Sequence, residues 1–381
     1  MRILKLELTC EQIKYKDEFN KFVNEIIIPE AAQIDRKQYL PREIIKELTI
    51  RGYLGLMIDE KYGGKGADAI TIGLLNEELG RGCTTVRNLI TVHGMVALAI
   101  QKWASEELKN KWLPKLASGE CIGAFGLSEP EIGSNAQGIK STVIDDKNHY
   151  VLNGSKKWIT MAQIADVFLV FAKYDGKPTA FLVERDTQGF NITPIIDMLG
   201  ARGSMVGELN FCNCKILKSN IVGSIGTGLS HVALSSLDYG RYTIAWGSVG
   251  LGQACINDSI VYASKREQFG NALKDNQLIQ KMITEMVVNV KAARQLCYKS
   301  GYLRQNCDPE SIMETWVAKY FASKMINQVA SNALQIHGAN GCCSDYPIER
   351  YFRDARINEI IEGTSQMHEI LIANNAMRGL R

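Results

Sequence analysis

The spacing of apolar residues changes twice along the chain and divides it into three zones. In residues 1–120 the apolar positions recur every three to four residues, which is the spacing of amphipathic helices. Pro41 and Ser105 stand at the start of such stretches, where proline is favoured in a first helical turn and serine at an N-cap. This zone is predicted to be a helical N-terminal domain.

In residues 121–225 the helical period gives way to short runs of β-branched and aromatic residues. Turn-forming pairs separate these runs, among them Asn153-Gly154 and Asp175-Gly176. The expected strands lie within residues 150–152, 158–160, 167–171, 181–183 and 208–211. The pattern predicts a compact antiparallel sheet or barrel as the middle domain.

From residue 226 to residue 381 the helical period returns in four long segments rich in Ala, Leu, Ile and Met. They cover residues 233–265, 273–304, 310–339 and 357–378. Four long helices of this kind favour a four-helix bundle as the C-terminal domain. The predicted fold class is therefore mainly α with a central β-domain, and the three zones are expected to pack as one rigid body.

Composition and charge exclude several classes of protein. The chain has 381 residues and a formal net charge of +3, and no basic run indicates a nucleic-acid partner. The ten cysteines contain no CxxC pair and the five histidines are scattered, so no metal site is predicted. The cysteines are expected to be reduced and mostly buried. The N-terminal stretch lacks a secretory apolar core, and no run of about 18 apolar residues indicates a membrane span. A cytoplasmic location is therefore expected.

Two segments of the middle zone carry residue types suited to ligand binding. Residues 124–135 (AFGLSEPEIGSN) combine small residues, which let the backbone approach a ligand, with hydroxyls that donate to phosphate or ring acceptors. Composition by itself favours a tight turn between domains. Residues 157–160 (KWIT) place an indole and a hydroxyl on a strand, which by itself is more typical of a core than of a cofactor site.

A third segment, residues 265–270 (KREQFG), is predicted to close a long helix. Arg266 and Phe269 would lie on one helical face, where a guanidinium and a ring could clamp a pyrophosphate and an adenine. A C-terminal cation that completes the helix dipole, with Gly270 as the stop, explains the segment equally well.

The fourth segment, residues 360–366 (IIEGTSQ), sets Glu362 beside Ile360 and Ile361. A carboxylate in apolar surroundings has a raised pKa, as a general base near neutrality requires. A helix N-cap with a surface glutamate is the alternative, and an isolated match would favour it. The sequence holds no Walker A motif, no GxSxG and no complete GxGxxG.

Together, these segments in this order resemble the acyl-CoA dehydrogenase family across essentially the whole chain. Further matching stretches are YVLNGSKKWIT, SSLDYGRYTIAWGSVGLG, LQIHGANG and YPIERYFRDARINEIIEGTSQ. The resemblance implies the three-domain fold described above, an FAD cofactor, and assembly as a homotetramer or homodimer.

The resemblance also assigns roles by position. The flavin ring and pyrophosphate would be held by Phe125, Leu127, Ser128, Gly133, Ser134, Trp158 and Thr160. A neighbouring subunit would lend to the same FAD the residues Arg266, Phe269, Gln277, Gln335 and Gly338. The adenosine side would be contacted by Thr364 and Gln366, and the substrate by Ser134, Asp238, Arg241 and Gly363. A helix ion pair is the structural alternative for Asp238 and Arg241.

In the mechanism that the resemblance implies, Glu362 takes the α-proton of an acyl thioester while the β-hydride passes to flavin N5. The thioester carbonyl would accept hydrogen bonds from the Glu362 N–H and a flavin ribityl hydroxyl. Some family members place the base just before the helix arginine, which here is Gly240, and glycine cannot serve. Glu362 is therefore the expected catalytic residue, with electron-transfer flavoprotein or oxygen as the electron acceptor.

The chain departs from the family pattern at Asn135, Met161, Ala339 and Ile361, which bears on the acyl group more than on FAD. Two stretches, residues 84–105 and 156–172, resemble the branch that acts on carrier-protein thioesters in polyketide pathways, where hydroxymalonyl or methoxymalonyl extender units are made. The expected substrate is thus a short acyl-CoA or acyl-carrier-protein thioester. A non-catalytic flavin-fold scaffold or carrier-protein binding module is the alternative function.

Overall fold

Two nearly buried helices, α4 and α5, form the centre of the first zone. The structure, a computed structural model, describes residues 7–378, so the start of the N-terminal stretch (1–6) and the end of the third zone (379–381) lie outside the described residues. The helices of this zone are α1 (Cys10–Phe22), α2 (Ile28–Lys37), α3 (Arg42–Ile50), α4 (Ala69–Gly82), α5 (Thr84–Trp103) and α6 (Glu106–Ala117). Ser105 accepts a hydrogen bond from the Leu108 N–H and caps α6 as predicted, while Pro41 lies one residue ahead of α3.

The middle zone forms one eight-stranded sheet. Its strands are β1 (Gly123–Gly126), β2 (Thr142–Asp146), β3 (His149–Ile159), β4 (Val167–Tyr174), β5 (Lys177–Glu184), β6 (Phe190–Pro194), β7 (Gly207–Leu217) and β8 (Ile221–Val222). Their order is β6-β7-β3-β2-β4-β5-β8, and β1 pairs with β4. The prediction of a purely antiparallel sheet is wrong at β4, which runs parallel to both β1 and β2. Tight turns allow only antiparallel pairs, whereas the longer connections here let strands return in the same direction.

The two turn predictions in this sheet have different outcomes. The Asp175-Gly176 turn joins β4 to β5 as predicted, with φ of 49° and 70°. The Asn153-Gly154 turn is wrong, because β3 continues through it with a shift in register between Leu152 and Gly154. A Cβ on Gly154 would lie 2.5 Å from the Ser141 Oγ, so the glycine permits a close approach rather than a reversal of the chain.

Among the described residues, the third zone is helical as predicted but forms five α-helices where four were expected. They are α7 (Leu234–Lys265), α8 (Gln277–Gln305), α9 (Ser311–His337), α10 (Ile348–Ile360) and α11 (Ser365–Arg378). The last predicted helix, 357–378, is broken between α10 and α11. The expectation that Arg266 and Phe269 share a helical face is also wrong, because α7 ends at Lys265 and a hairpin of β9 (Glu267–Gln268) and β10 (Asn271–Ala272) follows.

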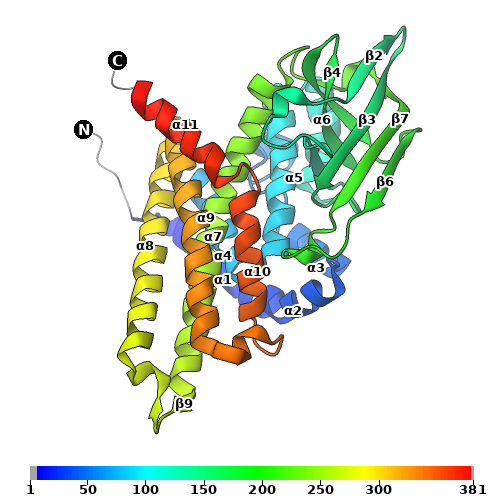
Figure 1. The fold of residues 1–381 in the computed structure, drawn as a ribbon. Coiled ribbons are helices and arrows are strands. Elements are labelled where there is room, and N and C mark those ends of the chain that lie inside the picture. The colour runs from blue at the N-terminus through cyan, green and yellow to red at the C-terminus, as the bar shows by residue number, and fades with distance from the viewer. Residues whose placement is uncertain (1–6, 379–381) are drawn as a thin grey trace.

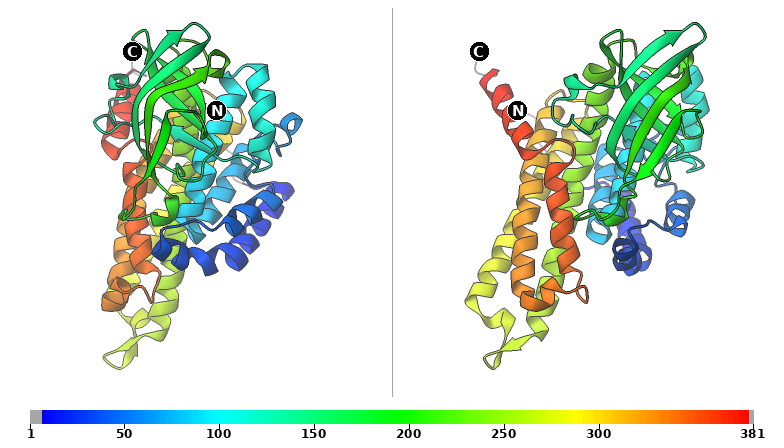
Figure 2. Two further views of the ribbon diagram at one scale, coloured as in Figure 1. Left: turned by 90° about the vertical axis from the view of Figure 1, so that its right-hand side faces the viewer. Right: turned by 45° about the vertical axis from the view of Figure 1, so that its right-hand side comes forward.

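Helix α5 lies between the sheet and the helical bundle, and α7 runs through the centre of the molecule (Figures 1 and 2). Helices α4 and α7 approach backbone to backbone, since a Cβ on Gly250 would lie 1.7 Å from the Glu77 carbonyl oxygen. Gly250 is thus a helix-packing residue. Buried Leu75, Leu79 and Val249 fill the surrounding core, and burying each such side chain stabilises the fold by about 1.5–3 kcal/mol.

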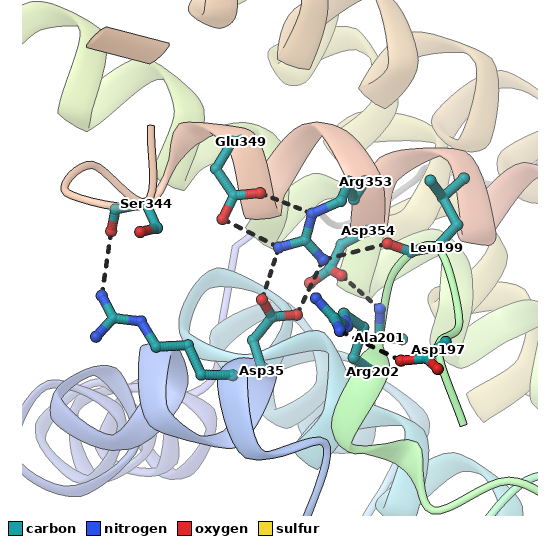
Figure 3. A network of polar contacts seen from close by, with 10 residues as sticks. Asp35, Asp197, Leu199, Ala201, Arg202, Ser344, Glu349, Arg353 and Asp354 are labelled. Carbon is teal, nitrogen blue, oxygen red and sulfur yellow. Dashed lines mark hydrogen bonds and ion pairs between the residues drawn. The ribbon is translucent and has the colours of Figure 1, made fainter. Parts of the chain in front are cut away.

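A network of ion pairs joins all three zones (Figure 3). Arg353 of α10 donates to both carboxylate oxygens of Asp35 on α2, at 3.0 and 2.6 Å, and to Glu349 on its own helix. It also donates to the Leu199 carbonyl in the segment between β6 and β7, at 3.2 Å. Asp354 accepts from the Ala201 N–H of the same segment at 2.6 Å. The network therefore fixes the sheet domain against both helical domains.

Cysteine burial differs from the prediction. All ten cysteines are free, but only Cys83, Cys214, Cys255 and Cys297 are buried and five are exposed. Most of the exposed thiols lie at helix starts and turns, where apolar spacing does not determine burial. Within residues 7–378, no helix combines the length and the apolar character needed to cross a bilayer.

Candidate active site

Glu362 lies in the break between α10 and α11, where the chain turns sharply. Ile361 is extended, and Glu362 and Gly363 then adopt left-handed conformations with φ of 56° and 94° before Ser365 begins α11. A left-handed conformation costs a residue with a Cβ roughly 1 kcal/mol or more, so the surroundings must hold Glu362 in place. Thr364 caps α11 by accepting from the Met367 N–H at 3.4 Å. Glu362 therefore does not act as the N-cap.

Two buried cations hold the carbonyl groups of this turn. Arg241 of α7 donates from Nε to the Glu362 carbonyl oxygen at 3.1 Å. Lys319 of α9 donates from Nζ to the carbonyl oxygens of Gly363, at 2.7 Å, and Glu359, at 3.4 Å. The carbonyls at the end of a helix have no intrahelical partner, so these contacts satisfy groups that the break leaves open.

The Glu362 side chain sits in a strongly perturbed environment. Its Oε2 is shielded from solvent and has no hydrogen-bond partner among the described residues. Burial raises the pKa of Glu362 to about 7, against the lowering effects of Arg241, Lys319 and Arg87. The surface-glutamate alternative is therefore wrong, and the geometry is that of a carboxylate able to accept a proton near neutrality.

The loop and strand predicted to hold the flavin meet in space. The Lys157 N–H on β3 donates to the Ser128 carbonyl oxygen at 2.9 Å, which joins residues 124–135 to the KWIT strand. Trp158 has φ of 66° and its side chain is 52% exposed, so it is not a core residue. Phe125 packs on Phe171 with ring centroids 5.1 Å apart, and Leu127 is buried.

A buried ion pair fixes this loop. Lys156, which is fully buried, donates to Glu129 Oε1 at 2.7 Å, and Glu129 also accepts from the backbone N–H groups of Lys140 and Ser141. Gly133 has open space on its Cβ side, and Ser134 and Gly133 are exposed. The loop is thus rigidly anchored, its backbone at Gly133 is accessible, and the exposed Trp158 indole and the half-buried Thr160 lie on the adjoining strand segment. This arrangement fits a flavin and its pyrophosphate.

The residues expected from a neighbouring subunit lie at the other end of the molecule, where Figure 1 shows β9 far from the sheet. Phe269 at the hairpin tip is 99% exposed. A pocket of about 360 Å³ lies beside the hairpin and is lined in part by Lys265, Arg266, His337 and Asn340. Exposed Gln335 and Gly338, at the end of α9, flank its His337 wall, and exposed Gln277 begins α8. One chain therefore cannot bring both residue sets to the same flavin.

The remaining predicted site residues have mixed placements. Asp238 and Arg241 do not pair with each other, because Asp238 accepts from Arg304 of α8 at 2.6 Å. The helix-ion-pair alternative is therefore wrong for these two residues. Thr364 is half-buried in the turn beside Glu362, whereas Gln366 is exposed on α11.

Two charged residues beside Glu362 were missed in the sequence. Lys319 is fully buried, and Arg87 of α5 is 1% exposed and donates to Asn358 at 2.8 Å. The Arg87 Nε and Nη1 have no partner in the part of the chain that the structure describes. The sequence signal that could have found them is a lone basic residue among the small and apolar residues of a predicted helix. Arg87 has such a setting in TTVRNLITVHG, and Lys319 has one in ETWVAKYFAS.

The sequence and fold match known proteins over nearly the whole chain. Residues 9–120 match the N-terminal domain of acyl-CoA dehydrogenase, residues 124–214 the middle domain and residues 226–377 the C-terminal domain. A glutaryl-CoA dehydrogenase from Desulfococcus multivorans is 36% identical over 376 residues, 96% of each chain. The chain belongs to the acyl-CoA dehydrogenase family. An acyl-CoA dehydrogenase from Bacillus subtilis is 35% identical over 98% of this chain and 100% of its own.

Solved structures agree with this membership. A glutaryl-coenzyme A dehydrogenase in complex with glutaryl-CoA superposes with a TM-score of 0.94 at 35% identity, covering 99% of this chain and 97% of the other. A Mycobacterium smegmatis glutaryl-CoA dehydrogenase in complex with FADH2 superposes at 0.92 with 31% identity, covering 97% and 95%. This acyl-CoA dehydrogenase is therefore an FAD-dependent oxidoreductase that dehydrogenates acyl thioesters, as the sequence predicted.

Two further structures of this fold are named for other kinds of substrate. A prolyl acyl carrier protein oxidase superposes with a TM-score of 0.93 at 29% identity, covering 97% of this chain and 100% of the other. A protein for biosynthesis of the methoxymalonyl extender unit of a polyketide superposes at 0.87 with 28% identity, covering 96% and 99%. The solved structures of this fold thus include one named for a CoA thioester and one named for an acyl carrier protein.

Proposed function

We propose that Glu362 is the catalytic base of this acyl-CoA dehydrogenase and removes the α-proton of a short acyl thioester. The observation that carries the proposal is the Glu362 carboxylate itself, held in a left-handed turn with an unpartnered, shielded Oε2 and a pKa raised by burial to about 7. A base with a pKa near the working pH combines a sizeable ionised fraction with useful basicity. Bound FAD supplies the two-electron acceptor for the β-hydride.

The surroundings of Glu362 support a short acyl group. Tyr239, the neighbour of Gly240 on α7, packs its hydroxyl against Gly94 of α5. A Cβ added to Gly94 would lie 2.5 Å from this hydroxyl oxygen. A cavity of about 10 Å³ lies beside Tyr239 and is also lined by Tyr53 and Ile90. A cavity of this size holds at most one water molecule, so it adds no room for an alkyl chain.

Arg87 supports a polar or acidic end on that acyl group. Its guanidinium is buried with two unpartnered nitrogen atoms, close enough to Glu362 for its charge to lower the pKa of the carboxyl. Buried charges are normally paired, and a carboxylate is the partner that a guanidinium binds best. Relatives named for glutaryl-CoA, a thioester with a free carboxylate, share about a third of the sequence.

A carrier-protein thioester is a second candidate for the form of the substrate. It is favoured by the resemblance of residues 84–105 and 156–172 to the polyketide extender-unit branch. Two structural neighbours also favour it, one named for a prolyl acyl carrier protein and one for a polyketide extender unit. Electron-transfer flavoprotein or oxygen would then reoxidise the flavin. A homotetramer or homodimer would complete each FAD site, since the β9–β10 hairpin that follows Arg266 lies far from β3, the strand of Trp158, in one chain (Figure 1).

Anaerobic bleaching of the flavin absorption band tests the proposal. Butyryl-CoA, glutaryl-CoA and a glyceryl-derived thioester on a carrier protein, with its primary hydroxyl oxidised, are compared. Rapid bleaching by one of the CoA thioesters assigns the CoA form, and bleaching by the carrier-protein thioester alone assigns the second candidate.

A matched pair of variants tests the base. Glu362→Gln is expected to slow bleaching by roughly a hundred- to ten-thousandfold with full FAD content, whereas Glu369→Gln on exposed α11 leaves the rate unchanged. Unchanged turnover in Glu362→Gln, with unchanged FAD content, would show that Glu362 is not the base.

A further inference from the structure

Lys319 occupies an unusual position beside the proposed base. Its side chain is fully buried on α9, among small residues such as Ala322 and Ser323. A buried ammonium group is costly unless it is paired and hydrogen-bonded. Two carbonyl groups of the α10–α11 turn hydrogen-bond this ammonium group, and the negative charge of Glu362 favours it electrostatically.

The ammonium group contacts the turn on both sides of Glu362. It donates to the Glu359 carbonyl, three residues before Glu362, and to the Gly363 carbonyl, one residue after it. Arg241 donates to one carbonyl of the turn, that of Glu362, and Arg87 donates to Asn358 on α10. Among these three cations, Lys319 alone bridges the turn that carries the base.

We propose that Lys319 is a positioning residue for Glu362, because its ammonium group fixes the 359–363 turn and supplies positive charge beside the carboxylate. This inference rests on the proposed function of Glu362. Its two effects act together, since the same hydrogen bonds that hold the left-handed turn keep the charge close to the base. The backbone N–H of Glu362 belongs to this turn, so the same anchor orients it.

The charge balance around Glu362 explains why a cation is needed. Burial favours the neutral form of the Glu362 carboxyl, and the cationic groups facing it are Arg241 from α7, Arg87 from α5 and Lys319 from α9. Burial also lowers the pKa of Lys319 to about 7, so its ammonium form prevails on the acid side of neutrality, where the acid limb of the proposed base lies. Glu359 of α10, Asp238 and Asp354 act on these cations rather than on Glu362 itself. His368 of α11 stays neutral, because burial lowers its pKa to about 4. Without Lys319, the remaining charges leave more of the base protonated at neutral pH.

Four variants of the holoenzyme test the inference. Lys319→Met removes charge and donor, Lys319→Gln keeps a donor without charge, and Lys319→Arg keeps the charge. Lys324→Met, at an exposed site on the same helix, is the matched control. The acid limb of the pH profile for flavin reduction is expected to move up by about one pH unit or more in the Met and Gln variants and to stay in place in the Arg and control variants.

A second readout does not depend on turnover. Difference infrared titration of the protonated carboxyl band, with Glu362→Gln as the reference lacking that band, measures the Glu362 pKa directly, including in a variant that retains little FAD. The same upward shift is expected in Lys319→Met. An unchanged Glu362 titration and an unchanged acid limb in the Met and Gln variants would overturn the role of Lys319, while leaving the separate Glu362→Gln test of the base intact.

Discussion

Gly240 on α7 lies directly against the carboxylate of Glu362. A Cβ built on Gly240 would lie 2.7 Å from both Cδ and Oε2 of Glu362, closer than side chains normally pack. The helix surface must therefore be bare at this point for the carboxylate to occupy its position. Gly240 stands at the position that bears the base in some members of the family, and here the absence of a side chain there leaves the space that the Glu362 carboxylate occupies.

Gly240→Ala is expected to slow flavin reduction by roughly a hundredfold, because the added methyl group displaces the carboxylate by about an ångström. Alanine favours the helix over glycine, so α7 itself should not suffer. Anaerobic stopped-flow reduction, with FAD content measured from absorbance, checks this.

A double variant separates the clash from other effects of Gly240→Ala. Aspartate is one methylene shorter than glutamate, so Glu362→Asp leaves room for the methyl group. Gly240→Ala should therefore lower the rate of flavin reduction by a much smaller factor in the Glu362→Asp variant than in the natural protein. Equal losses in both backgrounds would argue against direct contact as the cause.

Activity and stability are expected to depend on pH in opposite directions through Glu362. As the proposed base, Glu362 would act as a carboxylate, and burial raises its pKa to about 7, so flavin reduction should fall about tenfold per pH unit below pH 7. Because the pKa of Glu362 in the folded protein exceeds its usual value of 4.5, protonation of Glu362 favours the folded state. This contribution to the free energy of unfolding is present at acid pH and is lost as the pH rises through about 7. Thermal unfolding of Glu362→Gln should thus show a weaker loss of Tm between pH 4.5 and pH 8. Parallel curves for the two proteins would contradict the assignment.

Trp158→Ala is expected to weaken FAD binding roughly tenfold while leaving the apoprotein nearly as stable as before. The indole is 52% exposed, so the fold gains little from burying it. Equilibrium dialysis of FAD and unfolding of the apoprotein measure the two effects separately. Tyr39→Ala, which removes a ring 40% exposed elsewhere, is the control and should retain FAD.

Arg353→Gln is expected to destabilise the protein by roughly 3 kcal/mol, because it leaves Asp35 with no partner for a largely buried charge. Denaturant and thermal unfolding measure the loss. The matched control is Lys14→Gln, whose exposed pair with Glu18 spans 4.0 Å and should contribute less than about 1 kcal/mol. Similar losses in both variants would contradict the role of the network in joining the domains.

Arg87→Met is expected to lower the preference for a carboxylated acyl group. The ratio of kcat/KM for glutaryl-CoA to that for pentanoyl-CoA, which has the same chain length, should fall roughly ten- to hundredfold. Arg356→Met, at a site 53% exposed on α10, is the control and should keep the ratio. An unchanged kcat/KM ratio in Arg87→Met would show that Arg87 acts on Glu362 and does not bind the acyl group.

The local pattern of the sequence determined the elements of this protein but not all of their ends. Apolar periods of about two and 3.6 residues produced the three zones, and Ser105 marked the start of α6. The predicted helix of residues 357–378 ran through the break at Glu362, because its apolar spacing outweighed the boundary signal of Gly363 and the polar Thr364 that follows. The hairpin at Phe269 was missed because KREQFG reads equally well as the end of a helix.

The sequence by itself determined the family, the cofactor and the identity of the candidate base, because those depend on short motifs whose residues are neighbours in the chain. Only the tertiary structure decided the chemical state of Glu362. Its pKa and orientation depend on Gly240, Arg87 and Lys319, which come from three different helices. Charges and contacts act over ångströms in space, and a one-dimensional pattern carries no information about which distant residues folding brings within that range.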